Sequence, residues 1–229
     1  MKGRRGRAGT AGPTIVELVG IPGAGKTTKI STVASEFQRA GLTVEAVNLE
    51  EKVNRLLDAS PNGRRHRLTS APTHRPLLAL RLLLGVLPRP PRQAYGLVAD
   101  ACLRSQMVHR YRQRSSADVV LLDEGVSHLY LWATSHRTSD RGLVSPPRNH
   151  CDHVILVEAS HETAYNRLQA RDPAGVFAGM PFNEARLCFE RYERRLEAQF
   201  PQAVRGSDAP TIAALTHGLR ARHRERSNE

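Results

Sequence analysis

A glycine-rich segment near the N-terminus carries the clearest chemical pattern in the chain. Residues 20–27 read Gly-Ile-Pro-Gly-Ala-Gly-Lys-Thr and match the phosphate-binding pattern G-x-x-x-x-G-K-[ST] at every fixed position. The glycines let backbone N–H groups turn toward phosphate oxygens, and a following helix N-terminus adds partial positive charge. Lys26 is expected to reach the terminal phosphates of ATP, and Thr27 to ligate Mg²⁺. The expected nucleotide-binding residues are Gly20, Pro22, Gly23, Ala24, Gly25, Lys26, Thr27 and Thr28. A glycine-rich turn that binds nothing is the alternative.

A pair of acids after an apolar run gives a second chemical signal. Residues 119–125 read Val-Val-Leu-Leu-Asp-Glu-Gly, and a buried strand that ends in acids is typical of the second NTPase motif. Because ligands of an open parallel sheet bind beyond the carboxyl ends of its strands, Asp123 and Glu124 are expected near the phosphate-binding loop. Asp123 is predicted to orient Mg²⁺. Glu124 and Glu50 are the candidates for a catalytic base, which a hydroxyl acceptor needs and a phosphate acceptor does not. For Glu50, an acid at a helix N-terminus is an equal alternative.

Arginines give the third signal. Arg167 and Arg171 are four residues apart, so they share one face at the end of a predicted helix, just before a glycine-containing loop. We predict that both act from a mobile lid and neutralise charge on the transferring phosphoryl group, with a solvated pair as the alternative. Arg55 and Arg104 are candidates for binding the acceptor, with a surface position as the alternative for each. Further candidates for lining the acceptor pocket are Tyr95, His128 and Trp132, with packing on a helix face as the favoured alternative for Trp132.

Composition limits the class of protein and its partners. A chain of 229 residues that is 40% hydrophobic suits one α/β domain with a sizeable core. The net charge of +12 favours anionic partners, nucleic acid among them, but only four of the 34 basic residues are lysines, a skew that a GC-rich genome also explains. The three cysteines lack metal-site spacing and indicate a reducing compartment. No signal peptide or transmembrane segment is visible, so a cytoplasmic location is predicted. The oligomeric state stays open, a homodimer included.

Helix and strand signals alternate along the chain, as a parallel α/β sheet requires. The predicted strands are residues 14–19, 42–49, 118–122, 153–157 and 203–204. The predicted helices are residues 26–40, 50–59, 94–115, 125–136, 160–171, 183–200 and 212–222. Gly41 is expected to end the first helix, and Ser160 to cap the helix that carries Arg167.

Residues 60–92 differ in character from the rest of the chain. They contain six prolines around an apolar run at residues 77–87, which predicts a helical cap inserted over the site. The expected organisation is a basic flexible tail at residues 1–12, one domain at residues 13–222 and a flexible tail at residues 223–229. The lid loop is expected at residues 172–182.

Taken in order, these motifs resemble the P-loop nucleoside and nucleotide kinases, thymidylate kinases most of all, over residues 14–210. The resemblance implies a three-layer α/β/α P-loop NTPase fold around a central five-stranded parallel sheet, with Mg·ATP as donor and a mobile lid. Arg104 lies close to where thymidylate kinases keep an arginine that binds the acceptor phosphate. The chain departs from them at Asp123-Glu124, where they carry Asp-Arg, at residues 48–51, where they carry Glu-Pro, and in residues 60–92. The identity of the substrate therefore does not carry over.

Three classes of function remain, in order of preference. The first is an ATP-dependent phosphotransferase acting on a small hydroxyl- or phosphate-bearing acceptor, such as a nucleotide, a nucleoside or a similar metabolite. The second is a kinase that acts on nucleic acid, and the third is an NTPase switch without an acceptor. Arg104 and the two predicted lid arginines favour transfer over hydrolysis.

Overall fold

The computed structural model describes residues 12–58, 79–80, 91–135, 150–171, 177, 179–206 and 209–227. Within them, five parallel strands form one sheet in the order β2-β3-β1-β4-β5. The strands are β1 (Thr14–Val19), β2 (Val44–Asn48), β3 (Val119–Asp123), β4 (His153–Leu156) and β5 (Val204–Arg205). The central five-stranded parallel sheet implied by the resemblance is therefore confirmed.

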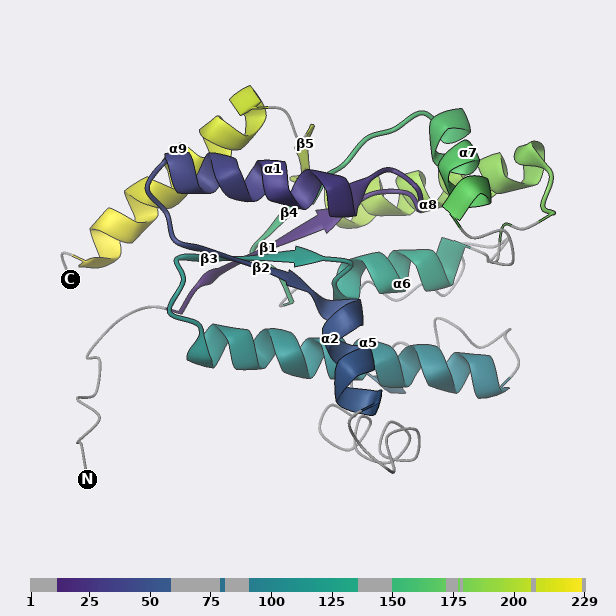
Figure 1. Ribbon diagram of the computed structural model, residues 1–229, viewed down its shortest axis with the longest axis horizontal. Coiled ribbons are helices and arrows are strands. Elements are labelled where there is room, and N and C mark those ends of the chain that lie inside the picture. Colours follow the sequence, from purple (N-terminus) through teal and green to yellow (C-terminus); the bar gives the residue numbers. More distant parts are fainter. Residues whose placement is uncertain are drawn as a thin grey trace.

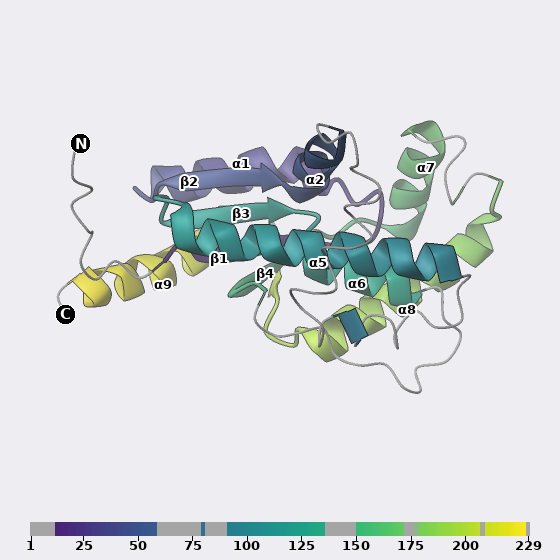
Figure 2. The same ribbon diagram turned by 90° about the horizontal axis from the view of Figure 1, so that it is seen from below.

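Helices cover both faces of this sheet (Figures 1 and 2). The helices are α1 (Lys26–Arg39), α2 (Leu49–Asp58), α5 (Pro91–Arg114), α6 (Val126–Ser135), α7 (His161–Arg171), α8 (Phe182–Gln199) and α9 (Ala209–Ser227). Helices α1 and α9 lie together on one face, and α5 covers the other. These are the three expected layers.

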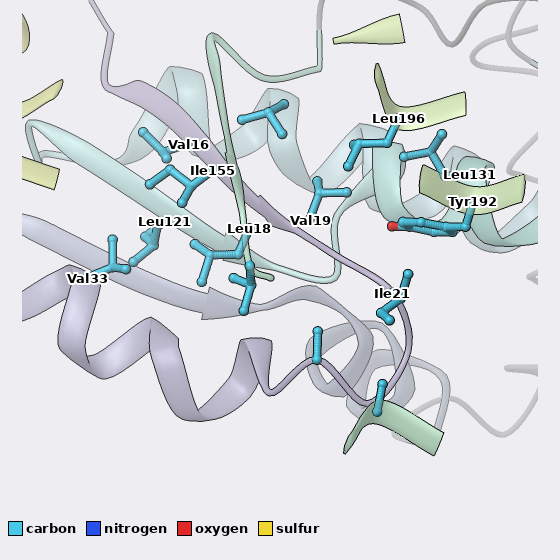
Figure 3. Close-up of a cluster of buried hydrophobic side chains, with 14 of the residues drawn as sticks. Val16, Leu18, Val19, Ile21, Val33, Leu121, Leu131, Ile155, Tyr192 and Leu196 are labelled. Carbon is cyan, nitrogen blue, oxygen red and sulfur yellow. The ribbon is translucent and has the colours of Figure 1, made fainter. Parts of the chain in front are cut away.

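Alternate side chains of β1 show why the layers form. Val16 and Leu18 pack into the same core cluster as Val33 of α1 (Figure 3), whereas Ile15 packs with Val108 of α5. A central parallel strand is buried on both faces, which explains its nearly continuous apolar sequence. The exception is Glu17, a fully buried acid in the middle of the strand.

Local signals in the sequence set most element ends. Gly41 has a φ of +82° directly after the last turn of α1, as expected for a helix-ending glycine. The Ser160 hydroxyl accepts the Thr163 N–H at 3.1 Å and so caps α7. Helix α5 begins at Pro91, three residues earlier than predicted, because proline is tolerated in a first helical turn.

The last helix is longer than the sequence analysis predicted. Helix α9 runs from Ala209 to Ser227, beyond the predicted end at residue 222 and into the predicted tail. No glycine or proline follows Gly218 before the end of the chain, so nothing in the sequence breaks the helix there.

Parts of the predicted organisation lie outside the described residues. This holds for the tail at residues 1–11, for the predicted cap except residues 79–80 and 91–92, and for residues 172–176 and 178 of the predicted lid loop. In the described part of the chain, none of the three cysteines forms a disulfide. None of the helices there has the length and apolar character needed to cross a membrane.

Candidate active site

The phosphate-binding loop joins β1 to α1, and the residues predicted to hold the nucleotide lie in this loop and in the first turn of α1. Gly23 has a φ of +82°, and a Cβ atom there would lie 2.3 Å from the Ala164 carbonyl oxygen of α7. Only glycine tolerates both this left-handed backbone conformation and this close contact, so the loop can lie directly against α7. The first N–H groups of α1 have no partner within the helix and remain suited to an anion.

Lys26 lies folded over this loop. Its side chain is 4% exposed, and its Nζ atom donates to the Gly20 carbonyl at 3.2 Å and lies 3.4 Å from that of Ile21. Burial lowers the pKa of Lys26, while the acids Glu124 and Asp123 raise it. The ammonium group is thus held at the mouth of the loop, next to the acids at the end of β3.

Asp123 ends β3 beside the loop, since Leu18 of β1 is its partner in the sheet. Both of its carboxylate oxygens are buried and lack a hydrogen-bond partner among the described residues. Burial raises the pKa of Asp123, and the nearby Thr27 hydroxyl lowers it. An unsatisfied buried carboxylate is costly, which suggests a missing partner of positive charge.

A hydroxyl and a carboxylate are hard oxygen ligands and suit Mg²⁺. Thr27 and Asp123, the residues predicted for this role, therefore fit the ion. No cluster of three or more His, Cys, Asp or Glu side chains suited to a metal occurs among the described residues. The remaining ligands of a magnesium ion would be phosphate oxygens and water, as Mg²⁺ usually prefers.

Glu124 occupies a strained turn between β3 and α6. Its φ of 55° lies in the left-handed region, where residues other than glycine are uncommon. Its Oε1 atom is 3.9 Å from Lys26 Nζ and 3.9 Å from His128 Nε2. The Arg104 guanidinium donates to its backbone carbonyl. Contacts on both the backbone and the side chain therefore hold a conformation that the residue alone would disfavour.

Glu50 lies beside Glu124 because of the register of β2 on β3. Asn48 pairs with Asp123, so the residues just beyond these strand ends are neighbours. The two carboxyl groups share a hydrogen bond, which raises the pKa of Glu50 to about 7. Burial raises the pKa of Glu124, but the same hydrogen bond and the charges of Lys26 and Arg104 together lower it. Glu124 is therefore the charged member of the pair, and Glu50 is the member that gives up or takes a proton near neutral pH.

Glu50 also retains its alternative role. The Asn48 side chain accepts the Glu51 N–H at 2.9 Å and caps α2, which puts Glu50 in the first turn of that helix. An acid there stabilises the helix dipole. Both interpretations of Glu50 from the sequence are thus compatible with its position.

The two arginines predicted to bind the acceptor have different environments. Arg104 is buried, donates to the Glu124 carbonyl and pairs with Asp100 Oδ2 at 3.1 Å. Arg55 is 78% exposed and pairs with Glu51 one turn away on α2. The structure therefore brings Arg104, but not Arg55, into the cluster around Glu124.

The two predicted lid arginines approach the loop from α7. Arg167 Nη1 is 3.4 Å from both the Gly23 and the Ala24 carbonyl oxygens. Arg171 is exposed, and its charge contributes to the lowered pKa of Lys26. Both cations are therefore near the place where the terminal phosphates of a nucleotide would lie.

Glu17 was missed by the sequence analysis. Its carboxylate accepts the backbone N–H groups of His128 at 2.9 Å and Ser127 at 3.4 Å, and so caps α6. A Cβ atom on Gly125 would lie 2.5 Å from its carboxyl carbon, so the turn after Glu124 packs directly on this acid. The available signal was a single charged residue in an otherwise apolar strand.

His128 and Tyr192 connect α6 and α8 to the same cluster. The His128 Nδ1 atom lies 2.7 Å from the Tyr192 hydroxyl, and the Gly20 backbone bonds to that hydroxyl. Burial lowers the pKa of His128 well below its usual value, so the ring is neutral. If the hydroxyl donates to Nδ1, the ring proton lies on Nε2, facing Glu124. The side chains of Tyr95 and Trp132 lie outside the described part.

Comparison with solved structures gave matches over nearly the whole chain at low identity. Thymidylate kinase from Candida albicans is 12% identical, with 95% of each chain covered and a TM-score of 0.49. A deoxyadenosine kinase from M. mycoides is 11% identical, with 90% of this chain and 98% of that chain covered and a TM-score of 0.48. Shikimate kinase from Acinetobacter baumannii is 12% identical, with 90% of each chain covered and a TM-score of 0.44.

No protein-family model and no curated protein matches the chain. Since the three TM-scores are all below 0.5, the fold assignment rests on this chain's own strand order and phosphate-binding loop. Together these two features define a P-loop α/β fold.

Proposed function

We propose that this chain is an ATP-dependent phosphotransferase that transfers the γ-phosphoryl group to a small acceptor bearing a hydroxyl or a phosphate. The convergence of three elements on one loop carries the proposal. Lys26 comes from α1, Asp123 from the end of β3 and Arg167 from α7. A loop that only turned the chain would need neither the buried ammonium nor the unsatisfied carboxylate beside it.

Each group has a chemical task in such a transfer. The loop N–H groups and Lys26 bind the phosphates of the donor, and Arg167 and Arg171 stabilise charge on the transferring group. Thr27 and Asp123 would hold Mg²⁺, which neutralises phosphate charge when it is bound. Glu124 lies 3.9 Å from Lys26 and shares a hydrogen bond with Glu50 beyond the end of β2, so it connects the donor residues to those on the acceptor side.

Transfer explains the site better than hydrolysis alone. A switch NTPase needs only to position a water molecule, whereas this site continues past Glu124 to Glu50, Asp100 and Arg104, which contact or influence one another. A built region next to the γ-phosphate position supports an acceptor molecule. Because the cluster lies at the strand ends, a small acceptor suits it.

The test is a measurement of Mg·ATP consumption across nucleosides, nucleotides, sugars and oligonucleotides, with mass spectrometry of the products. Lys26→Ala should lower the rate of phosphoryl transfer by about 100-fold or more, because it removes a charge that acts in the transition state. Lys29→Ala, three residues further along the same helix and exposed, is the matched control and should keep full activity. A folded Lys26→Ala variant with unchanged ATP turnover would contradict the proposal.

A further inference from the structure

Beyond Lys26, the site continues into a group of side chains that we call the acceptor wall: Glu50, Asp100, Arg104 and Glu124. They come from α2, α5 and the turn after β3. Since Arg167 and α7 flank the phosphate-binding loop on the β4 side, the side toward β3 and β2 is left for an acceptor. The chemistry of the acceptor wall therefore bears on which acceptor fits.

The acceptor wall has three carboxyl groups and a single guanidinium. Both Nη atoms of that guanidinium are engaged, and its Nε atom, which lacks a hydrogen-bond partner among the described residues, is buried. Arg104 donates through Nη1 to the Glu124 carbonyl and pairs through Nη2 with Asp100 at 3.1 Å. Its side chain is 5% exposed, so it faces the protein interior. Among the described residues, no free cation of the acceptor wall remains to bind an anionic acceptor.

Arg55, the other arginine predicted to bind the acceptor, adds no free positive charge to the acceptor wall. It is on the exposed side of α2 and already paired with Glu51. A phosphate brought against the acceptor wall would therefore meet Glu50 and Glu124 with no described counter-charge besides Lys26 and the arginines of α7. Those cations are needed by the donor phosphates.

We infer that the acceptor is a neutral hydroxyl compound, and that Glu50, positioned by Glu124, binds its hydroxyl group and takes its proton. The inference rests on the proposed function, because it concerns the acceptor of the same transfer. Glu50 is the member that touches the acceptor, since it is exposed, whereas Glu124 is held from three sides by Lys26, His128 and Arg104. Glu124 acts by positioning Glu50.

The step balances as written. The acceptor oxygen forms a bond to the γ-phosphorus of ATP while the bond from that phosphorus to the β–γ bridging oxygen breaks. The hydroxyl proton passes to the Glu50 carboxylate, and the bridging oxygen leaves with ADP. The products are ADP, a phosphate monoester and one proton, which Glu50 later releases to water. A phosphate acceptor would instead give a phosphoanhydride and would need no base.

The experiment compares matched acceptors on the full-length protein with Mg·ATP. Nucleosides are tested beside their own monophosphates, together with sugars and polyols. A sample without added acceptor measures transfer to water, which is hydrolysis. Phosphorus NMR and mass spectrometry distinguish a monoester from an anhydride. Glu50→Gln should lower the rate of transfer to a hydroxyl by about 100-fold or more, the usual contribution of a general base. Glu51→Gln, the neighbouring exposed acid, should leave that rate unchanged.

Each outcome decides the matter. A monoester product that is lost in Glu50→Gln and kept in Glu51→Gln supports the inference. An anhydride formed from a monophosphate overturns it and leaves the proposed function intact, as does a Glu50→Gln variant with the wild-type rate. Wild-type ATP consumption no greater than that of Lys26→Ala with every acceptor, or hydrolysis by water as the only reaction, overturns the proposed function itself. If Glu50→Gln fails to fold, the product class made by the wild-type protein still decides.

Discussion

The donor side of the site and the acceptor wall are built in opposite ways. The donor side is built around one continuous segment, residues 20–28, in which backbone groups and glycine geometry do most of the binding, and to which Asp123, Arg167 and Arg171 add their charges. The acceptor wall is assembled from three elements that are distant in the sequence, and the register of β2 on β3 brings two of its acids together. A phosphate chain can be bound by a local motif, whereas selection of an acceptor needs the tertiary fold.

The two sides also differ in charge. Lys26, Arg167 and Arg171 make the donor side positive, and the acceptor wall is negative. They meet at the Lys26–Glu124 pair, whose charged atoms are 3.9 Å apart. The arrangement separates the binding of an anion from the binding of its neutral partner. The following variants test this division, from the largest expected effect to the smallest.

Asp123→Asn tests the donor side most directly. We expect kcat for phosphoryl transfer to fall about 100-fold, with a smaller change in KM for ATP, because the carboxylate acts on metal geometry in the transition state. Since burial raises the pKa of Asp123, its charged form destabilises the fold. The variant should therefore be more stable than wild type without Mg²⁺, by about 1 kcal/mol. Steady-state kinetics and denaturant unfolding measure both effects; a change in KM alone would place Asp123 away from the metal.

His128 variants test how Glu124 is held between the two sides. In His128→Asn a polar atom remains near Nδ1 to bond Tyr192, but nothing reaches Glu124, so kcat should fall about tenfold with little change in stability. In His128→Gln the amide extends toward Glu124, and the Tyr192 hydroxyl loses its side-chain partner and keeps only the Gly20 backbone, which should lower the free energy of unfolding by about 1 kcal/mol. Equal kinetics for both variants would show that the contact with Glu124 has no role.

Glu17 variants test how the buried acid behind the turn after Glu124 affects the stability of the protein. Burial raises the pKa of Glu17 above its usual value of 4.5, so the folded state favours the protonated acid. The contribution of Glu17 to stability is therefore complete below pH 4.5 and is lost as the pH rises through its raised pKa. Glu17→Gln should gain stability relative to wild type as the pH increases. Denaturant unfolding of both proteins at several pH values checks this, and a constant difference would contradict it.

Arg55→Ala should have the smallest effect. Because Arg55 is 78% exposed in a surface ion pair, its loss should change the free energy of unfolding by less than about 0.5 kcal/mol. The KM for the acceptor should stay the same. A rise in that KM would show that Arg55 contacts the acceptor and would weaken the inference of a neutral acceptor.

The donor side was accessible from the sequence because its signals are local. The eight-residue motif fixes the loop, and buried parallel strands have apolar sequences that locate their ends within about two residues. The end of β3 followed from its apolar run, and with it the position of Asp123 beside the loop.

The acceptor wall was only partly accessible, because its contacts depend on tertiary structure. Glu17 caps N–H groups 110 and 111 residues away in the sequence, and no local pattern indicates that partner. Arg55 and Arg104 are alike in sequence, but the two helices point them in opposite directions, one to solvent and one to the protein interior. The Glu51–Arg55 spacing of four residues indicates a partner for Arg55, but Asp100 and Arg104 have the same spacing, so it does not distinguish the two arginines.

The backbone of Glu124 has a consequence for protein engineering. Its φ of 55° is a conformation that glycine adopts without cost and glutamate does not. A selection for heat resistance alone would therefore favour glycine at this position and enrich proteins that fold well but have lost the charge between donor and acceptor. Improved variants of this protein should be sought under a selection that also requires turnover, because at this residue stability and activity demand different side chains.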